Sequence, residues 1–314
     1  MKLKKPKFWD YKKPNYLSNF FYPISKIYEL FLKLKLRNKK SIKNIKTICI
    51  GNIYVGGTGK TSFAIELMKI LNEKKIKACF IKKQHSNQFD EQKLLEKFGK
   101  TFVNKSRLEA LKEASEKEYK IAIFDDGLQD KGISYDVSFV CFNQQNMFGN
   151  GRVIPSGPLR ESLDNLNEYK NIVVNGNQKD ELNNKTFFSE NLKKLNFYNS
   201  TYQPINLNDF NVEDSFIVFS GIGNHNTFLE MLLLNKFKIL KDLEYPDHYN
   251  YSKMDIDEII SLAKKLNAKI LTTEKDYLRL QENLRQNINC VKINLKINQL
   301  NEIKNKLDNL YESV

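Results

Sequence analysis

The sequence has little of what marks a secreted or membrane-spanning protein. It contains only four cysteines in 314 residues, and none has CxxC spacing, so we expect reduced, buried thiols and neither a disulfide framework nor a zinc site. No stretch approaches twenty consecutive apolar residues, which argues against a spanning helix. The lysine-rich N-terminus lacks the short apolar core and the small-residue cleavage site of a signal peptide. We therefore expect a cytoplasmic protein.

Arginine is also scarce, and this bears on the partner. Only six of the 51 basic residues are arginine, the side chain whose planar fork reads phosphates and guanines, so no nucleic-acid partner is expected. The 51 basic and 37 acidic residues give a net charge of +14. Residues 1–43 hold 13 basic and two acidic residues, a net +11, which leaves +3 for the rest of the chain. The positive charge is therefore a property of the N-terminal segment.

This basic segment also contains the pattern of an amphipathic helix. Its apolar stripe consists of Phe20, Ile24, Ile27, Phe31 and Leu34. These residues recur at spacings of three and four, while lysines point away from the stripe. A helix of this kind suits the plane of an anionic membrane surface, with the apolar side in the acyl boundary. The pattern leaves open an alternative, in which the helix docks on the protein's own core.

The rest of the chain has the alternation of a layered α/β protein. With 41% hydrophobic residues it can bury the core of one large or two ordinary domains. Strands are expected at 47–50, 78–81, 121–124, 137–142, 171–174, 216–220, 238–240 and 270–272. Helices are expected at 60–73, 91–98, 106–117, 226–235, 255–266 and 298–311. Short apolar runs that alternate with helical patterns predict a mainly parallel sheet. The Asn- and Lys-rich stretch 175–208 is expected to be irregular.

The strongest local signal is a glycine-rich loop between a predicted strand and a predicted helix, GNIYVGGTGKT at 51–61. Backbone N–H groups of such a loop turn onto phosphate oxygens, Lys60 reaches the terminal phosphates and Thr61 can bind Mg²⁺. The strict pattern has glycine six residues before the lysine, where this chain has tyrosine. The residues expected to hold the nucleotide are Tyr54, Val55, Gly56, Gly57, Thr58, Gly59, Lys60 and Thr61.

Two adjacent acids follow another apolar run. Asp125 and Asp126 come directly after 121–124, which places their carboxylates at the carboxyl edge of a parallel sheet, beside the phosphate loop. Hydrated Mg²⁺ that bridges ATP phosphates needs hard oxygen ligands of this kind. The sequence therefore predicts an ATP and Mg²⁺ site that includes Thr61 and both acids.

Further motifs give the chain a family resemblance. They are DDGLQ at 125–129, FGNGRVIPSGPLRE at 148–161, SGIGN at 220–224, PDHY at 246–249 and TTEKD at 272–276. Together with the phosphate loop they closely resemble the tetraacyldisaccharide 4'-kinase family of lipid A biosynthesis, over nearly the whole chain. The resemblance implies transfer of the ATP γ-phosphate to the 4'-hydroxyl of tetraacyldisaccharide 1-phosphate. It also implies that the protein is located at the cytoplasmic face of the bacterial inner membrane.

The resemblance implies roles for individual residues. Asp125, Asp126 and Glu161 become acids of the Mg²⁺–ATP region. Asp90 becomes the base toward the sugar hydroxyl, and His248 the group that orients it or tunes its pKa. ATP and Mg²⁺ are the implied cofactors and the lipid A precursor disaccharide is the implied acceptor, while no protein partner is implied.

The chain departs from the family pattern at several positions. The Gly-Asp-Glu-Pro motif appears as FDEQ at 89–92, and the Arg-Gly-Tyr segment after the second strand is absent from 81–88. Asp130 stands where the family has histidine, and Ser62 where it has proline. The motifs for ATP are thus better kept than those nearest the acceptor sugar, so a shifted acceptor preference is a hypothesis.

The phosphate loop and the acids alone would also allow a nucleotide switch of the P-loop GTPase or metallochaperone type. Two observations favour the kinase. No guanine-reading Asn-Lys-x-Asp motif follows a later predicted strand, and the motif at 148–161 has no role in a switch.

The predicted fold is α/β, a P-loop NTPase-like and mainly parallel sheet with flanking helices. We expect three parts. Residues 1–43 form the basic N-terminal segment with its membrane-contacting helix, 44–204 the P-loop kinase domain, and 205–314 a smaller C-terminal α/β domain.

Overall fold

The computed structural model describes the whole chain except residues 1–4, 35–38, 85–88, 177–194 and 212. Its larger sheet consists of β1 (Lys46–Gly51), β2 (Ala78–Lys83), β3 (Thr101–Asn104), β4 (Ile121–Asp125), β5 (Val137–Asn143), β6 (Lys170–Asn175), β7 (Asn196–Pro204) and β12 (Ile293–Ile297). The strand order is β12-β7-β6-β5-β1-β4-β2-β3. All neighbouring pairs are parallel except β12 with β7. The predicted mainly parallel sheet is confirmed.

Helices cover both faces of this sheet, which explains why its strands are almost continuously apolar. The helices are α2 (Lys60–Glu73), α3 (Phe89–Glu96), α4 (Arg107–Glu116), the short α5 (Leu166–Tyr169) and α10 (Leu300–Glu312). Ile48 and Ile50 pack into the core shared with α2, α3 and α10, whereas Cys49 between them belongs to the core shared with α4 and α5. Successive side chains of β1 thus point to opposite faces.

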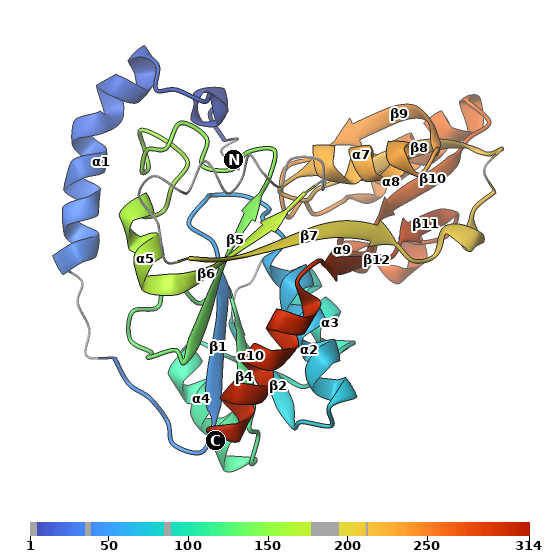
Figure 1. The fold of residues 1–314 in the computed structure, drawn as a ribbon. Coiled ribbons are helices and arrows are strands. Elements are labelled where there is room, and N and C mark those ends of the chain that lie inside the picture. Colours follow the sequence, from blue (N-terminus) through green and yellow to red (C-terminus); the bar gives the residue numbers. More distant parts are fainter. Residues whose placement is uncertain (1–4, 35–38, 85–88, 177–194, 212) are drawn as a thin grey trace.

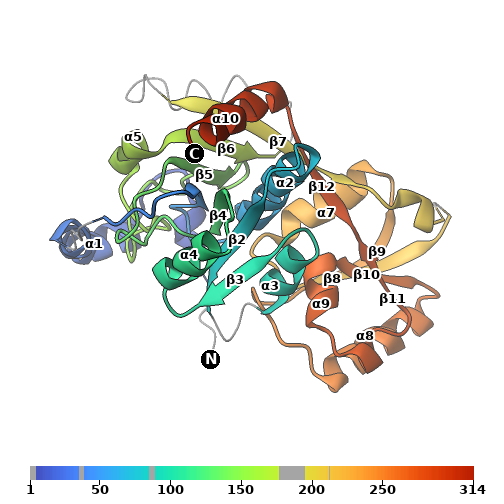
Figure 2. The same cartoon turned by 90° about the horizontal axis from the view of Figure 1, so that it is seen from below.

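A smaller sheet of four parallel strands lies beside the larger one (Figure 2). Its order is β11-β10-β8-β9, from β8 (Ser215–Ser220), β9 (Lys238–Glu244), β10 (Lys269–Thr273) and β11 (Ile288–Val291). It is flanked by α7 (His225–Leu234), α8 (Lys253–Lys265) and α9 (Glu274–Arg279). A capping box between Ser252 and Asp255 starts α8, which satisfies N–H groups that the first turn leaves without helical partners.

The chain crosses between the two sheets twice, whereas the sequence pattern predicts a single boundary at residue 205. After β11 the chain returns, because β12 pairs antiparallel with β7 and α10 packs beside α2. The alternating apolar residues Ile293, Leu295 and Ile297 are the signal for this edge strand. The expectation of irregular structure over 175–208 is wrong at β7. Its polar residues do not give the apolar pattern that predicts a strand.

The N-terminal helix α1 (Tyr16–Leu34) stands at one side of the larger sheet, and the smaller sheet lies at the other (Figure 1). It docks through small polar residues. The Ser18 hydroxyl donates to the Ser156 carbonyl (2.7 Å), and the Ser25 hydroxyl to the Val153 carbonyl (2.8 Å). The apolar stripe faces away and each of its five side chains is 51–73% exposed. Among the described residues, no helix is both long and apolar enough to span a bilayer.

Candidate active site

The glycine-rich loop connects β1 to α2, as the sequence predicts. Gly59 precedes the first turn of α2 with a left-handed φ of 84°, and a Cβ there would lie only 2.2 Å from the Asn175 amide. The same amide donates to the Thr58 carbonyl, and the Ser200 hydroxyl in turn bonds Asn175. Polar residues at the end of β6 and in the middle of β7 therefore hold the loop in place. The Thr58 hydroxyl is buried and has no partner among the described residues.

The other end of the loop is held by the 148–161 motif and the N-terminal segment. The Val55 N–H donates to the Pro158 carbonyl (2.9 Å). The Tyr54 side chain is buried, and its hydroxyl donates to Asp10 and accepts from Lys5 Nζ (2.7 Å). A Cβ on Gly56 would lie 3.3 Å from the Tyr54 ring, so the ring packs against the loop beside a residue that has no side chain.

Asp125 ends β4 beside the first turn of α2. Its Oδ2 accepts from Lys82 Nζ (2.8 Å) and from the Thr61 hydroxyl (3.3 Å). Its Oδ1 is buried without a partner in the described part of the chain. A buried carboxylate oxygen without a donor, next to a threonine hydroxyl at a phosphate loop, fits the donor set of Mg²⁺. The geometry of Thr61 and Asp125 is therefore compatible with the predicted metal site.

The other two predicted acids sit in separate contacts. Asp126 accepts from Arg160 Nη1 (3.1 Å) and lies 3.7 Å from Lys60 Nζ. Burial opposes its ionisation, but the charges of Lys60 and Arg160 outweigh burial and lower the pKa of Asp126. Glu161 is held by the Tyr169 hydroxyl (2.9 Å) and the Asn165 amide (2.8 Å). Over the described ranges, no three acids, histidines or cysteines form a cluster that could hold a metal ion by itself.

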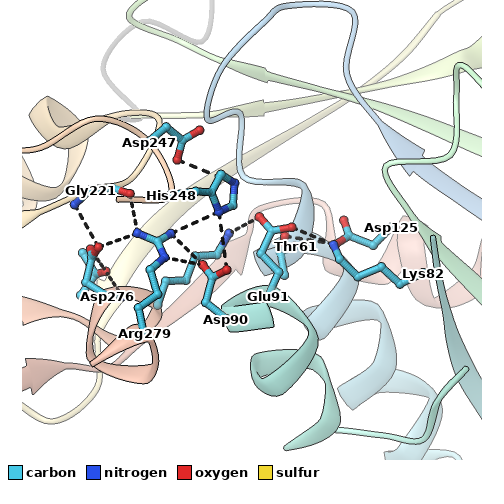
Figure 3. Close-up of polar contacts among 12 residues, drawn as sticks. Thr61, Lys82, Asp90, Glu91, Asp125, Gly221, Asp247, His248, Asp276 and Arg279 are labelled. Carbon is cyan, nitrogen blue, oxygen red and sulfur yellow. Dashed lines mark hydrogen bonds and ion pairs between the residues drawn. The ribbon is translucent and has the colours of Figure 1, made fainter. Parts of the chain in front are cut away.

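Asp90 and His248 meet where the two sheets adjoin (Figure 3). Asp90 lies in the first turn of α3 and is 2% exposed. His248 Nδ1 is 3.5 Å from Asp90 Oδ1, while Arg279 on α9 donates to Oδ2 from Nε (2.9 Å) and Nη2 (2.7 Å). Burial would raise the pKa of Asp90, but the bond with His248 and the charges of Arg279 and Lys275 lower it to about 2. The carboxylate is therefore ionised at neutral pH.

This arrangement can be compared with known proteins. The family model described as "Tetraacyldisaccharide-1-P 4'-kinase" matches residues 17–312. The tetraacyldisaccharide 4'-kinase of Pelagibacter ubique (strain HTCC1062) is 54% identical over 313 residues, which cover 99% of each chain. The chain belongs to the tetraacyldisaccharide 4'-kinase family.

More distant relatives of the kinase agree. The tetraacyldisaccharide 4'-kinase of Rickettsia canadensis (strain McKiel) is 32% identical over 327 residues, which cover 98% of this chain and 97% of the relative. The fold is similar to a crystal structure of LpxK from Aquifex aeolicus in complex with ATP, with a TM-score of 0.72 at 22% identity over 94% of this chain and 99% of that chain. The family predicted from the motifs and the α/β fold are confirmed, and the nucleotide-switch alternative is not supported.

Sequence reasoning missed a row of buried and partly buried charged side chains in the kinase. Lys82, at the end of β2, donates to Glu91 (2.7 Å) as well as to Asp125, and Lys275 on α9 donates to the other Glu91 oxygen (2.8 Å). Burial opposes the charge of Glu91, but Lys275 and Lys82 hold its pKa well below the usual range. The row connects the predicted metal acid to the smaller sheet. A lysine directly after the apolar run 78–81 was the available signal.

The SGIGN motif of the kinase brings the smaller sheet to the phosphate loop. Gly223 lies so close that a Cβ on it would stand 2.4 Å from the Gly57 nitrogen, so only glycine allows this approach. Asn224 caps α7 through the Thr227 N–H (3.1 Å). The phosphate loop, the predicted metal acid Asp125 and the Asp90–His248 pair therefore lie around one junction between the sheets.

Proposed function

We propose that this chain transfers the γ-phosphate of ATP to the 4'-hydroxyl of tetraacyldisaccharide 1-phosphate. The observation that supports this most directly is the junction itself. On one side is the phosphate loop with Asp125, and on the other the Asp90–His248 pair, with Lys82 and Glu91 between them. Phosphoryl transfer needs mainly positioning and electrostatic stabilisation, and this junction could bring a nucleotide and a sugar hydroxyl together.

The nucleotide side of the proposal uses the loop at 54–61. Its backbone N–H groups and Lys60 bind the phosphates. Thr61 and Asp125 would hold Mg²⁺, which supplies neutralisation of the charge on the β- and γ-phosphates. Asp126 and Glu161 are proposed as further acids of this region, with Asp126 keeping Lys60 oriented across 3.7 Å.

The acceptor side uses Asp90 as the base. The 4'-hydroxyl oxygen attacks the γ-phosphorus, the bond to the ADP oxygen breaks, and Asp90 accepts the hydroxyl proton. Oδ1 is the oxygen available for this, since Oδ2 already accepts two bonds from Arg279. His248, 3.5 Å from Oδ1, orients the carboxylate.

An activity measurement tests the proposed reaction. Full-length protein with Mg²⁺, ATP and tetraacyldisaccharide 1-phosphate in vesicles is expected to give a product one phosphate group heavier by mass spectrometry. The Lys60→Ala variant is expected to give none, because the terminal phosphates lose their cation. Phosphorylation of a different acceptor with none of this one, or turnover with GTP in preference to ATP, would contradict the proposal.

We also propose that α1 lies on the anionic cytoplasmic face of the bacterial inner membrane. The serine face of the helix is occupied by residues 153–156, so the exposed apolar stripe is left for another surface. A net charge of +11 over residues 1–43 favours an anionic bilayer as that surface.

Vesicle flotation tests this placement. Replacing Phe20, Ile27 and Phe31 together by serine is expected to weaken binding to anionic vesicles by at least about a hundredfold, since each buried side chain contributes about 1.5–3 kcal/mol. The matched control replaces Leu233, Leu234 and Met254, which are equally exposed but lie on the smaller-sheet unit. Equal flotation of both variants, or equal binding to neutral vesicles, would remove α1 from the proposal.

A further inference from the structure

Arg279 holds the proposed base from the opposite sheet. Both of its donors to Asp90 bind the same oxygen, Oδ2, at 2.9 and 2.7 Å. The two side chains are nearly inaccessible, with exposures of 6% and 1%. The contact joins α9 to α3, and therefore the smaller sheet to the larger one (Figure 3). A buried charge pair in this geometry fixes direction as well as charge, because the guanidinium is planar and rigid.

Arg279 is itself firmly held. Its Nη1 donates to Asp276 Oδ1 (2.7 Å) and to the Gly221 carbonyl (2.6 Å). Asp276 is fully buried and also accepts from the Tyr251 hydroxyl (2.9 Å) and the Gly221 N–H (2.9 Å). The TTEKD and SGIGN motifs thus supply a rigid support for one guanidinium.

We propose that Arg279 is a positioning residue that occupies one oxygen of Asp90 and thereby presents the other, Oδ1, to the acceptor hydroxyl. The inference rests on the proposed role of Asp90 as base. It adds a condition to that role, since Asp90 is correctly oriented only while α9 is packed against α3.

The charges around Asp90 support the same reading. Arg279 and Lys275 face Asp90 from α9. His248 faces it from the segment before α8, and Asp247 lies next to that histidine. Glu91 is the next residue of α3. Burial of the carboxylate raises the pKa of Asp90, whereas the neighbouring cations lower it. Without the guanidinium, burial would count for more and the pKa of Asp90 would rise.

The pH dependence of kcat/KM for the acceptor tests this role between pH 4.5 and 9. The wild-type acidic limb lies below this range, because the pKa of Asp90 is about 2, whereas in Arg279→Gln the limb is expected to move upward into the range, with little change in KM for ATP. Arg279→Lys keeps the charge but not the fork, so its pH profile is expected to match the wild type while its kcat stays lower. Arg285→Gln is the matched control, because Arg285 binds carbonyls of the same unit, those of Leu278 and Leu280.

A lower rate with an unshifted pH profile in Arg279→Gln would overturn the inference, and so would the same shift in Arg285→Gln. Thermal unfolding of each variant separates these outcomes from misfolding. Failure of the proposed base is a different result. If Asp90→Asn keeps wild-type turnover, Asp90 is not the base. If Asp90→Asn is inactive and the pH profile of Arg279→Gln is unshifted, only the proposed role of Arg279 is wrong.

Discussion

Replacing Asp90 with asparagine is expected to lower kcat by about 10²–10⁴-fold, the usual contribution of a positioned base. Asparagine has nearly the same shape and can still accept from Arg279, but it carries no charge and takes up no proton. KM for ATP should stay close to the wild-type value, because the loss falls on the transition state and not on nucleotide binding. Steady-state phosphorylation of the acceptor at saturating ATP measures the effect.

Asp130→Asn is the control for this substitution. Asp130 lies 3.7 Å from Arg107, and about a quarter of its side chain is exposed. Its loss is expected to change kcat by less than about tenfold, since it is not placed to accept the hydroxyl proton. Equal losses in the two variants would mean that Asp90 acts through general electrostatics and not as the base.

Replacing Lys82 with methionine is expected to lower the free energy of unfolding by about 3–5 kcal/mol. Methionine fills much of the lysine volume, but it leaves the buried Asp125 and one oxygen of the partly buried Glu91 without their cation. Denaturant unfolding in the absence of nucleotide measures the change. The adjacent Lys83 is exposed, so Lys83→Met should stay within about 0.5 kcal/mol of the wild type. A loss in Lys82→Met as small as that in Lys83→Met would show that water or rearrangement compensates the acids.

The contribution of Lys82 and its partners to stability depends on pH through the pKa shifts of Glu91 and Lys82. The pKa of Glu91 is lowered, so its contribution is present above its ordinary value of 4.5 and is lost as the pH falls through the folded value. Burial opposes the charge of Lys82, but Asp125 and Glu91 raise its pKa, so its contribution is present below its ordinary value of 10.5 and is lost only above that. The difference between wild type and Lys82→Met should therefore be largest between about pH 5 and 10.

What the sequence could predict was local. The loop at 51–61 and the strand before Asp125 are each predicted by consecutive residues. Each such pattern indicates one local structure at the edge of a parallel sheet. The strand β7 was missed because Asn199 and Ser200 are buried polar residues, and Ser200 supports the phosphate loop through Asn175. A polar strand of this kind carries no periodic apolar signal.

The acceptor side could not be derived from spacing at all. Asp90 and His248 come together only because the smaller sheet packs against α3, so their pairing was implied by the family resemblance alone. Arg279 and Glu91 were missed for the same reason, since each finds its partner across the junction. Long-range packing of charged side chains leaves no trace in a local pattern.

The hydroxyl of Tyr54 connects the N-terminal segment of this kinase to the phosphate loop. It is buried in the phosphate loop, yet both of its partners, Lys5 and Asp10, precede α1. Trp9 between them donates to the Pro155 carbonyl (3.0 Å), in the same motif on which α1 rests. Deleting the N-terminal segment would therefore leave a buried hydroxyl without partners in the nucleotide site, at a cost of about 1–3 kcal/mol. The segment that carries α1 is therefore a structural component of the nucleotide site, and its truncation is expected to destabilise that site.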